Sequence, residues 1–195
     1  MAFSFNKRDS MLHYKLYTDG SFSQKNNIGG WAFDMRTHGD EPPKGTIPHI
    51  KQSGYKINSN IHEMELLPIV KALSLVPNHI PIVIYSDNKG IINEINSLIN
   101  GKTKIKRKNC SSCNDLWNTL AQLLTRKHVT ANWVKAHSGI KINEMVNIEA
   151  QLQVQQQQDC QKKRIKRQCP KKTHPHPTLI RLRLTTAYPL LTLIR

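Results

Sequence analysis

The chain has 195 residues, four of them cysteines, and a net charge of +16. This length suffices for one buried core and a further segment outside it. No apolar run is long enough to cross a membrane, and the start MAFSFNKRDS lacks the apolar centre of a signal peptide. We therefore expect an intracellular protein, cytoplasmic or nuclear, without a membrane partner. The positive charge suits a polyanionic partner, although it is equally explained by solubility and a basic tail.

Three strands are expected in the first third of the chain. Residues 13–19 alternate aromatic or branched side chains with polar ones, and residues 28–36 begin next to a Gly–Gly pair. Residues 46–57 also have the composition of a strand. Pro48 and Gly54 interrupt this third segment, which predicts an irregular strand at a sheet edge.

Residues 61–76 change to helical periodicity, with apolar side chains near one face. Asn60 is the expected N-cap of this helix. Because Pro68 lies within the segment, we expect either a kink or a helix that begins one turn later.

Strands and helices alternate along the rest of the domain. Residues 81–85 form a short continuous apolar run, as in a buried parallel strand. The remaining expected elements are a strand at 129–134 and helices at 89–99, 115–126 and 143–156. This order predicts the α/β class: a mixed five-stranded sheet flanked by helices, with three antiparallel strands first and parallel strands after them.

The composition divides the chain into three parts. Residues 1–11 form an N-terminal extension, residues 12–151 a single domain and residues 152–195 a basic tail. The tail contains a glutamine run and ten of the 29 Lys and Arg residues, and it has no periodic apolar face. We therefore expect poor order in the tail, with its cations adding nonspecific affinity for nucleic acid.

The cysteines allow more than one interpretation. Disulfides are not expected in a reduced compartment. Cys110 and Cys113 have the spacing of half a zinc knuckle, but the Cys and His residues of the tail follow at a spacing that fits no familiar zinc finger. The sequence leaves open whether Cys110 and Cys113 bind zinc.

Three acidic residues stand at the ends of, or beside, apolar runs. Asp19 ends the first expected strand and Asp87 follows the first parallel strand, so both open on one rim of the sheet if the strands are neighbours. Glu65, one turn into the next helix, can reach the same rim. Taken singly, each has an ordinary explanation: a turn for Asp19, a helix cap for Asp87 and a solvated helix position for Glu65.

Carboxylates that converge repel one another and tend to protonate. A divalent cation reverses this tendency, and hard oxygen ligands with open water positions select Mg²⁺, with Mn²⁺ as a possible substitute. Two such ions about 4 Å apart can activate water and stabilise the leaving oxygen in phosphodiester attack.

The segments Tyr17–Ser21, Met64–Leu67 and Tyr85–Asn88 (YTDGS, MELL and YSDN) occur in the order of the active-site pattern of type 1 ribonuclease H, which they resemble. The resemblance covers roughly residues 12–151. It implies a Mg²⁺-dependent enzyme that cuts the RNA of an RNA–DNA hybrid, with Asp19, Glu65 and Asp87 as catalytic metal ligands. Glu65 is preferred to Glu63 because the family motif is Met-Glu-Leu.

A fourth segment, residues 133–147, departs from this pattern at its last position. The family motif ends in Asn-Glu-x-x-Asp, and Asn147 stands where the aspartate is expected. An amide oxygen can still bind a metal or its water but carries no charge, so we expect Asn147 to be a weak fourth metal ligand. We therefore expect reduced nuclease activity, with complete loss of activity as the alternative. Glu149 points elsewhere on the helix and is a poor substitute.

His137 lies in a Gly-containing loop before the last expected helix. The resemblance implies that His137 is a catalytic residue that moves protons or aids product release, work to which an imidazole near a metal-bound water is suited. A surface loop histidine is the alternative. Glu144 is expected to orient the site or to cap the helix.

A basic segment and the neighbours of the acids are expected to bind nucleic acid. The five cations Lys102, Lys104, Lys106, Arg107 and Lys108 resemble the basic handle of many bacterial ribonucleases H, which contacts the DNA strand; a nuclear-localisation signal or a solvated loop is the alternative. Expected contacts with phosphates and 2′-hydroxyls are Gly20, Ser21, Asn60 and Asn88.

The sequence thus predicts a monomeric endoribonuclease that hydrolyses the RNA strand of RNA–DNA hybrids by a two-metal mechanism. The alternative is a catalytically impaired ribonuclease H-like module that binds nucleic acid, as a retroelement remnant would. Another nuclease of the same fold is a third interpretation, against which the basic segment and the His137 loop argue.

Overall fold

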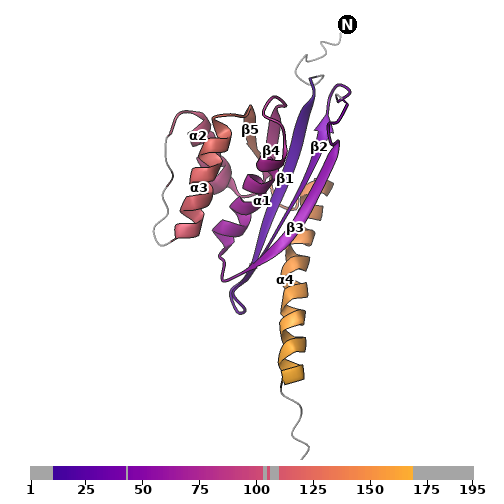
Figure 1. The fold of residues 1–195 in the computed structure, drawn as a ribbon, viewed down its shortest axis with the longest axis vertical. Coiled ribbons are helices and arrows are strands. Elements are labelled where there is room, and N and C mark those ends of the chain that lie inside the picture. Colours follow the sequence, from indigo (N-terminus) through magenta and orange to yellow (C-terminus); the bar gives the residue numbers. More distant parts are fainter. Residues whose placement is uncertain (1–10, 43, 103–104, 106–109, 169–195) are drawn as a thin grey trace, which may run out of the picture.

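A computed structural model describes residues 11–42, 44–102, 105 and 110–168 of the chain. A five-stranded sheet with the order β3-β2-β1-β4-β5 lies at its centre (Figure 1). β1 (His13–Ser23), β2 (Ile28–His38) and β3 (His49–Ile57) are antiparallel neighbours, whereas β4 (Ile82–Ser86) and β5 (Val129–Trp133) run parallel to β1. The predicted mixed sheet is confirmed.

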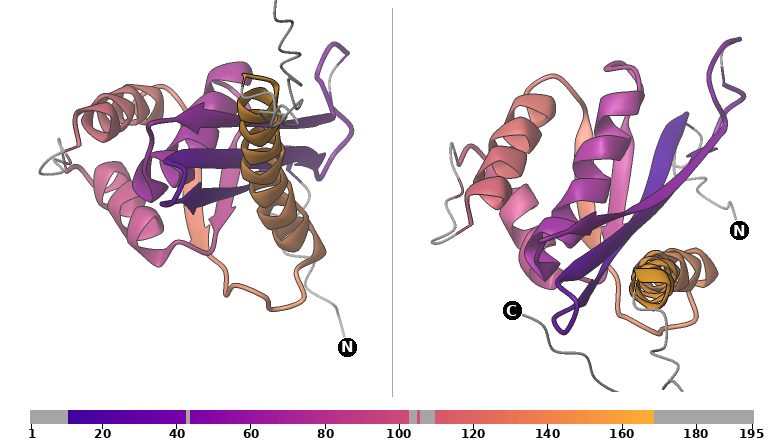
Figure 2. Two further views of the ribbon diagram at one scale, coloured as in Figure 1. Left: turned by 90° about the horizontal axis from the view of Figure 1, so that it is seen from below. Right: turned by 60° about the horizontal axis from the view of Figure 1, so that its bottom comes forward.

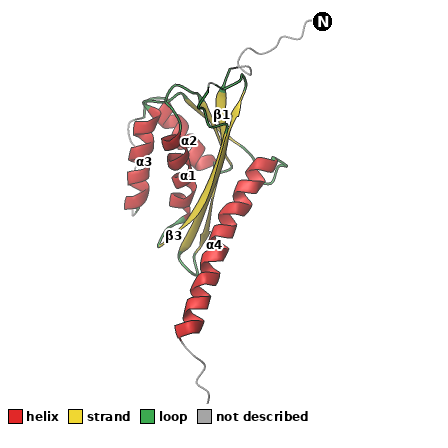
Figure 3. Cartoon of the chain, turned by 45° about the vertical axis from the view of Figure 1, so that its right-hand side comes forward, coloured by secondary structure: helices red, strands yellow, loops and turns green. Residues whose placement is uncertain are grey.

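The helices cover both faces of the sheet. α1 (Ile61–Leu75), α2 (Lys89–Ile99) and α3 (Ser111–Leu124) lie on one face, and α4 (Lys141–Gln168) lies on the other (Figures 2 and 3). α1 packs on β1 and β2, α3 packs on α1, and α4 contacts β1, β2 and β3. Within the described ranges no helix combines the length and apolar character that crossing a bilayer requires.

Apolar burial differs between the two faces. The main core lies between the sheet and α1–α3, where side chains such as Phe33 and Ile69 are fully buried. On the other face the buried apolar cluster is small, with Ala32 of the sheet against Val146 and Ala150 of α4. A Cβ on Gly30 would lie 2.1 Å from the carbonyl oxygen of Ala150, so glycine is needed for α4 to approach this closely.

The first helix begins where its cap predicts. Asn60 Oδ1 accepts a hydrogen bond from the Glu63 backbone N–H at 3.0 Å, and α1 starts at Ile61. The alternative of a start one turn later is therefore wrong, and Pro68 lies inside the helix. β3 is an edge strand, as predicted, and it begins at His49, directly after Pro48.

The predicted end of the last helix is wrong. We expected it to end at 156 and residues 152–195 to be poorly ordered, but α4 continues to Gln168. Polar contacts replace the missing apolar periodicity: Gln153 Nε2 donates to Ser53 Oγ at 3.1 Å, and Gln158 Nε2 donates to Ser23 Oγ at 2.9 Å. The glutamines therefore attach the helix to β3 and to the β1–β2 hairpin. Residues 1–10 and 169–195 lie outside the described residues.

The expectation that disulfides are absent is also wrong. Cys110 and Cys113 are disulfide-bonded, whereas Cys160 is a free, exposed cysteine. α3 begins earlier than predicted, with Cys110 as its N-cap, so the two sulfurs lie one helical turn apart on the same side. Because neither sulfur of a disulfide is a thiolate, this arrangement offers no zinc ligands.

Candidate metal centre and active site

Three elements bring three carboxylates together. Asp19 in β1, Glu65 in α1 and Asp87 after β4 each offer one oxygen, and these oxygens lie within 4.8 Å of one another. The parallel register pairs Tyr17 with Tyr85, so Asp19 and Asp87 each lie two residues beyond a paired position and leave the sheet at the same level. The rim expected from the strand order is thus formed, and α1 supplies the third acid.

Glycine at position 20 lets β1 and α1 lie in contact beside the acids. A Cβ on Gly20 would be 2.6 Å from the backbone nitrogen of Glu65 and 2.8 Å from the carbonyl oxygen of Met64. These are backbone atoms of the helix and cannot turn away. Any side chain at position 20 would therefore push Glu65 away from Asp19.

Neighbouring polar groups fix the backbone around Asp87. Asn88 caps α2, since its Oδ1 accepts from the Ile91 backbone N–H at 3.1 Å. The buried Ser86 Oγ accepts from the Asn88 backbone N–H at 3.1 Å, and Trp133 Nε1 donates to the Asp87 carbonyl oxygen at 2.9 Å. The capping role considered for Asp87 is filled by Asn88, so the Asp87 carboxylate does not cap the helix.

Burial and mutual repulsion favour the protonated acids. Burial, followed by the charge of Asp87, raises the pKa of Asp19 to about 7, against the opposing hydrogen bond from the Gly20 backbone N–H. Burial, followed by the charges of Asp19 and Asp87, raises the pKa of Glu65 to about 9, against a hydrogen bond with the side chain of Asn88. Without a compensating cation, Glu65 is thus mostly protonated at neutral pH and Asp19 is about half protonated.

These donors fit a hard divalent cation. Glu65 Oε2 is buried and has no hydrogen-bond partner among the described residues. An orphan carboxylate oxygen is costly to bury unless it is protonated or bound to a cation. Three carboxylates without nitrogen or sulfur donors match the preferences of Mg²⁺ and Mn²⁺ rather than those of zinc.

The residues of the fourth motif lie on α4. Asn147 Oδ1 accepts a hydrogen bond from Gln151 Nε2 at 2.9 Å, a contact that a metal at this oxygen would have to compete with. Glu149 Oε1 accepts from Ser53 Oγ at 2.9 Å, and its Oε2 lies 3.4 Å from Lys51 Nζ. Glu149 is therefore directed to β3, in agreement with its expected failure to substitute for the missing acid.

The His137 loop contributes no residue to the group of three close carboxylates. His137 is exposed, has a φ of 52° and is not a member of the group within 4.8 Å. The Gly139 backbone N–H donates to Glu144 Oε1 at 3.1 Å, so Glu144 ties the loop to the first turn of α4. Glu63, the acid set aside in favour of Glu65, is buried and forms an ion pair with Lys56.

The expected nucleic-acid contacts are only partly described. Gly20 and Ser21 continue β1 beside Asp19, Asn88 follows Asp87, and Asn60 is half-buried at the start of α1. Lys102 is exposed. Lys104, Lys106, Arg107 and Lys108 lie outside the described residues.

Sequence reasoning assigned no role to Ser86 or Trp133. Trp133 bonds the Asp87 carbonyl oxygen and Ser86 bonds the backbone N–H of Asn88, the next residue; Lys89 Nζ lies 5.6 Å from the centre of the Trp133 ring. Trp133 is the first residue of the fourth motif, so the sequence identifies its position. Its contact joins the end of β5 to the end of β4, and residue spacing along the chain does not predict such a contact.

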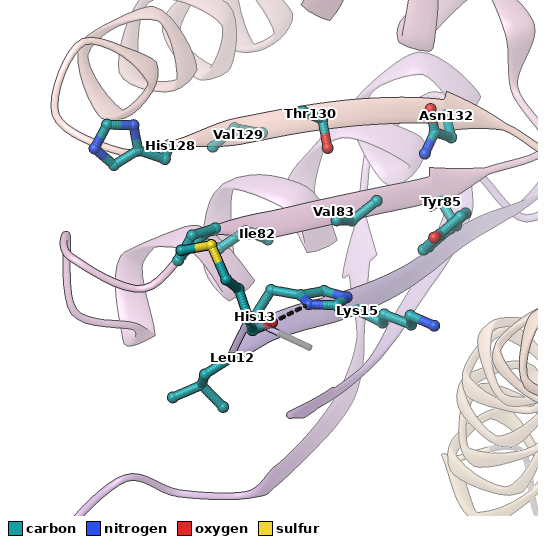
Figure 4. Close-up of a pocket in the computed structure, with 12 residues that line it drawn as sticks. Leu12, His13, Lys15, Ile82, Val83, Tyr85, His128, Val129, Thr130 and Asn132 are labelled. Carbon is teal, nitrogen blue, oxygen red and sulfur yellow. Dashed lines mark hydrogen bonds between the residues drawn. The ribbon is translucent and has the colours of Figure 1, made fainter. Parts of the chain in front are cut away.

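A cavity of about 560 Å³ lies elsewhere (Figure 4). Its lining follows β1, β4 and β5, from His13, Ile82 and Val129 at one end to Tyr85 and Asn132 at the other. None of Asp19, Glu65 and Asp87 lines this cavity, so it is separate from the carboxylate group.

Residues 12–155 match the family model of RNase H. The chain belongs to the ribonuclease H family. It is 31% identical over 145 residues to Ribonuclease H of Francisella philomiragia, an alignment that covers 72% of this chain and 88% of that protein. It is 34% identical over 142 residues to Ribonuclease H of Ruthia magnifica, covering 70% and 92% of the two chains.

The fold also agrees with a solved ribonuclease H structure. The structure of LC9-RNase H1, described as a type 1 RNase H with the type 2 active-site motif, superposes with a TM-score of 0.59 and 17% identity. The match covers 74% of this chain and 72% of the other. At this identity the likeness supports the fold alone, and membership of the ribonuclease H family follows from the sequence matches.

Proposed function

We propose that this chain is an endoribonuclease that hydrolyses the RNA strand of RNA–DNA hybrids with Mg²⁺, or with Mn²⁺ in its place. The observation that carries the proposal is the convergence of Asp19, Glu65 and Asp87, with a buried oxygen of Glu65 that has no partner among the described residues. The relatives named Ribonuclease H, which align over most of their own length, support the substrate class. The enzyme would act as a monomer in the cytoplasm or the nucleus.

Each acid has a defined part in the proposed site. Asp19, Glu65 and Asp87 hold the metal, and Asn147 is its weak fourth ligand. When bound, the cations activate water and stabilise the leaving oxygen of the phosphodiester. Gly20 and Asn88 keep the acids in place through the close approach of α1 and the cap of α2.

His137 is proposed to accept or return a proton from its exposed loop. Its left-handed backbone is unusual for a residue other than glycine, and strained positions of this kind are frequent in functional loops. The tie between Gly139 and Glu144 limits where the imidazole can move.

Contact with the hybrid is proposed for residues around the acids and for the basic segment. Gly20, Ser21, Asn60 and Asn88 would touch phosphates or 2′-hydroxyls, and the segment that begins at Lys102 would contact the DNA strand. Such contacts read the shape of the hybrid rather than its sequence.

A second candidate function is binding of hybrids without efficient cleavage. Asn147 replaces a charged ligand, and its carbonyl oxygen already accepts a hydrogen bond from Gln151. Both features weaken the affinity for one of the two metals, so an impaired module of retroelement origin stays the rival interpretation.

Cleavage of an end-labelled RNA–DNA hybrid in Mg²⁺ and in Mn²⁺ tests the proposal. The chain should release products with 3′-hydroxyl and 5′-phosphate ends, and Asp87→Asn should abolish this release. Asp115→Asn is the matched control, because Asp115 is an exposed acid of α3 outside the carboxylate group. Equal cleavage by wild type and Asp87→Asn would contradict the proposal. Binding without cleavage, even in Asn147→Asp, would favour the second candidate.

A further inference from the structure

The disulfide at the start of α3 joins one partly accessible cysteine to one buried cysteine. Cys110 is the N-cap of α3 and is half-buried, whereas Cys113 is 1% exposed. Thiol–disulfide exchange requires a sulfur that an incoming thiolate can reach and a second sulfur close enough to resolve the mixed disulfide. Cys110 and Cys113 meet these two requirements.

The two sulfurs have different hydrogen-bonding neighbours. Asn60 Nδ2 lies 3.4 Å from Cys110 Sγ, and the Cys113 backbone N–H donates to the same sulfur at 3.3 Å. Two N–H donors at the N-terminus of a helix stabilise a thiolate. Cys113 Sγ instead lies 3.6 Å from Asn60 Oδ1, a hydrogen-bond acceptor, which favours a protonated thiol.

We propose that Cys110 and Cys113 form a reversible dithiol–disulfide couple that exchanges with low-molecular-weight thiols of the glutathione class, and that its state changes the contacts of Asn60. In reduction, the small thiolate attacks Cys110 Sγ, the bond to Cys113 breaks, and Cys113 leaves and takes up a proton. A second small thiolate then attacks the mixed disulfide and releases Cys110 as the thiolate. Two small thiols become one small disulfide, and the protein gains two electrons.

The consequence for Asn60 follows from its position. In the disulfide, Cys113 Sγ carries no proton, and Asn60 Oδ1 accepts the N–H of Glu63, which caps α1. In the reduced form the Cys113 thiol adds a second donor to the same oxygen. Asn60 is then held more firmly at the start of the helix that carries Glu65. This step rests on the proposed function, in which Asn60 contacts the hybrid, and it predicts hybrid binding that is about threefold weaker in the reduced form.

The couple itself is tested by thiol chemistry, without any measurement of cleavage. The full chain with Cys160→Ser and Cys169→Ser is equilibrated with mixtures of reduced and oxidised glutathione, quenched with acid and alkylated, and its thiols are counted by mass. The two thiols should appear together as reduced glutathione increases, and Cys110 should alkylate faster than Cys113. With Cys113→Ser added, Cys110 should instead collect one glutathione. Independent glutathione adducts on both cysteines, or two free thiols in oxidised glutathione, would overturn the couple.

The link to Asn60 is tested by hybrid binding in Ca²⁺ for the oxidised and the reduced protein. The expected threefold difference should disappear in Asn60→Ser, which keeps a side chain able to cap α1. Equal affinity of the two wild-type forms would overturn the link while the thiol result still decides the couple. Absence of binding in both forms would contradict the proposed function and the link together.

Discussion

The buried carboxylate of Asp34 and the carboxylate group of Asp19, Glu65 and Asp87 differ in how their negative charge is compensated. Asp34 on β2 is 1% exposed, and Arg36 donates to it with Nε at 2.7 Å and Nη2 at 2.9 Å. His49 Nε2 lies 3.1 Å from the same carboxylate. Burial alone would raise the pKa of Asp34, but the hydrogen bonds and charges of Arg36 and His49 prevail and lower it.

Asp19 and Glu65 are comparably buried but form no ion pair with a cation of the described residues, and their pKa values are raised. The comparison shows that burial does not by itself mark a functional acid. The two sites differ in their neighbours. Asp34 lies beside the cation Arg36, whereas each of Asp19, Glu65 and Asp87 lies beside further acids. In the proposed function, a bound ion supplies the missing positive charge.

The largest expected effect is that of Glu65→Gln. Loss of one metal ligand removes several kcal/mol of charge stabilisation, which corresponds to cleavage slowed by about 10³-fold or more. The same change removes an acid that must take up a proton on folding near neutral pH, so the metal-free protein should melt at a higher temperature than the wild type. Steady-state cleavage and thermal unfolding in a chelator measure the two effects. A variant that is both active and less stable would contradict the assignment of Glu65.

Arg36→Met should have the opposite pattern. It leaves the buried Asp34 carboxylate with only His49 beside it, and because Arg36 is half-exposed, its loss should cost about 2 kcal/mol of unfolding free energy, less than in a fully buried ion pair. Cleavage per folded molecule should be unchanged. Urea unfolding followed by Trp fluorescence, with cleavage measured well below the transition, separates the two quantities. An undiminished free energy of unfolding would show that Arg36 does not compensate Asp34.

The stability of the metal-free protein should depend on pH with opposite signs at the two groups. The raised pKa values of Asp19 and Glu65 mean that the folded state holds more protons than the unfolded state from about pH 4 up to about pH 9. Stability should therefore fall as the pH rises through this window. The lowered pKa of Asp34 contributes stability above about pH 4, and this contribution is lost as the pH falls further.

Thermal unfolding across this range, in a chelator and in excess Mg²⁺, measures both trends. Added Mg²⁺ should remove most of the decrease at high pH, and Glu65→Gln should flatten it. A melting temperature that rises with pH in the chelator would contradict the raised pKa values.

The smallest effect is expected from Asn147→Asp. A restored carboxylate strengthens one metal site, so cleavage at limiting Mg²⁺ should increase about tenfold, with little change at saturating Mg²⁺. Asn147→Ser is the matched control and should not increase cleavage. No gain in Asn147→Asp at any Mg²⁺ concentration would show that position 147 does not bind metal.

The order of strands and helices could be predicted from the sequence because local periodicity determines each element. The positions of Asp19 and Asp87 relative to each other follow from the parallel pairing of two adjacent strands. The extent of α4 could not be predicted, because its glutamines are held by Ser23 and Ser53 from distant parts of the chain.

The disulfide and the supports of Asp87 escaped prediction for related reasons. The absence of a disulfide was expected from the cellular compartment. The bond between Cys110 and Cys113 depends instead on the exact start of α3, which places Cys110 one helical turn from Cys113. The Trp133 contact with the Asp87 carbonyl depends on how the ends of two strands meet. Such contacts require the three-dimensional arrangement and have no signature in residue spacing.

Calorimetric titration of the chain with Mn²⁺, in the absence of nucleic acid, tests most directly whether the acids require an external cation. Wild type and Asp34→Asn should bind Mn²⁺ with similar affinity, whereas Asp87→Asn should lose most of the binding heat. Equal binding by Asp87→Asn and wild type would contradict the central claim, because the ion would then lie somewhere other than between Asp19, Glu65 and Asp87.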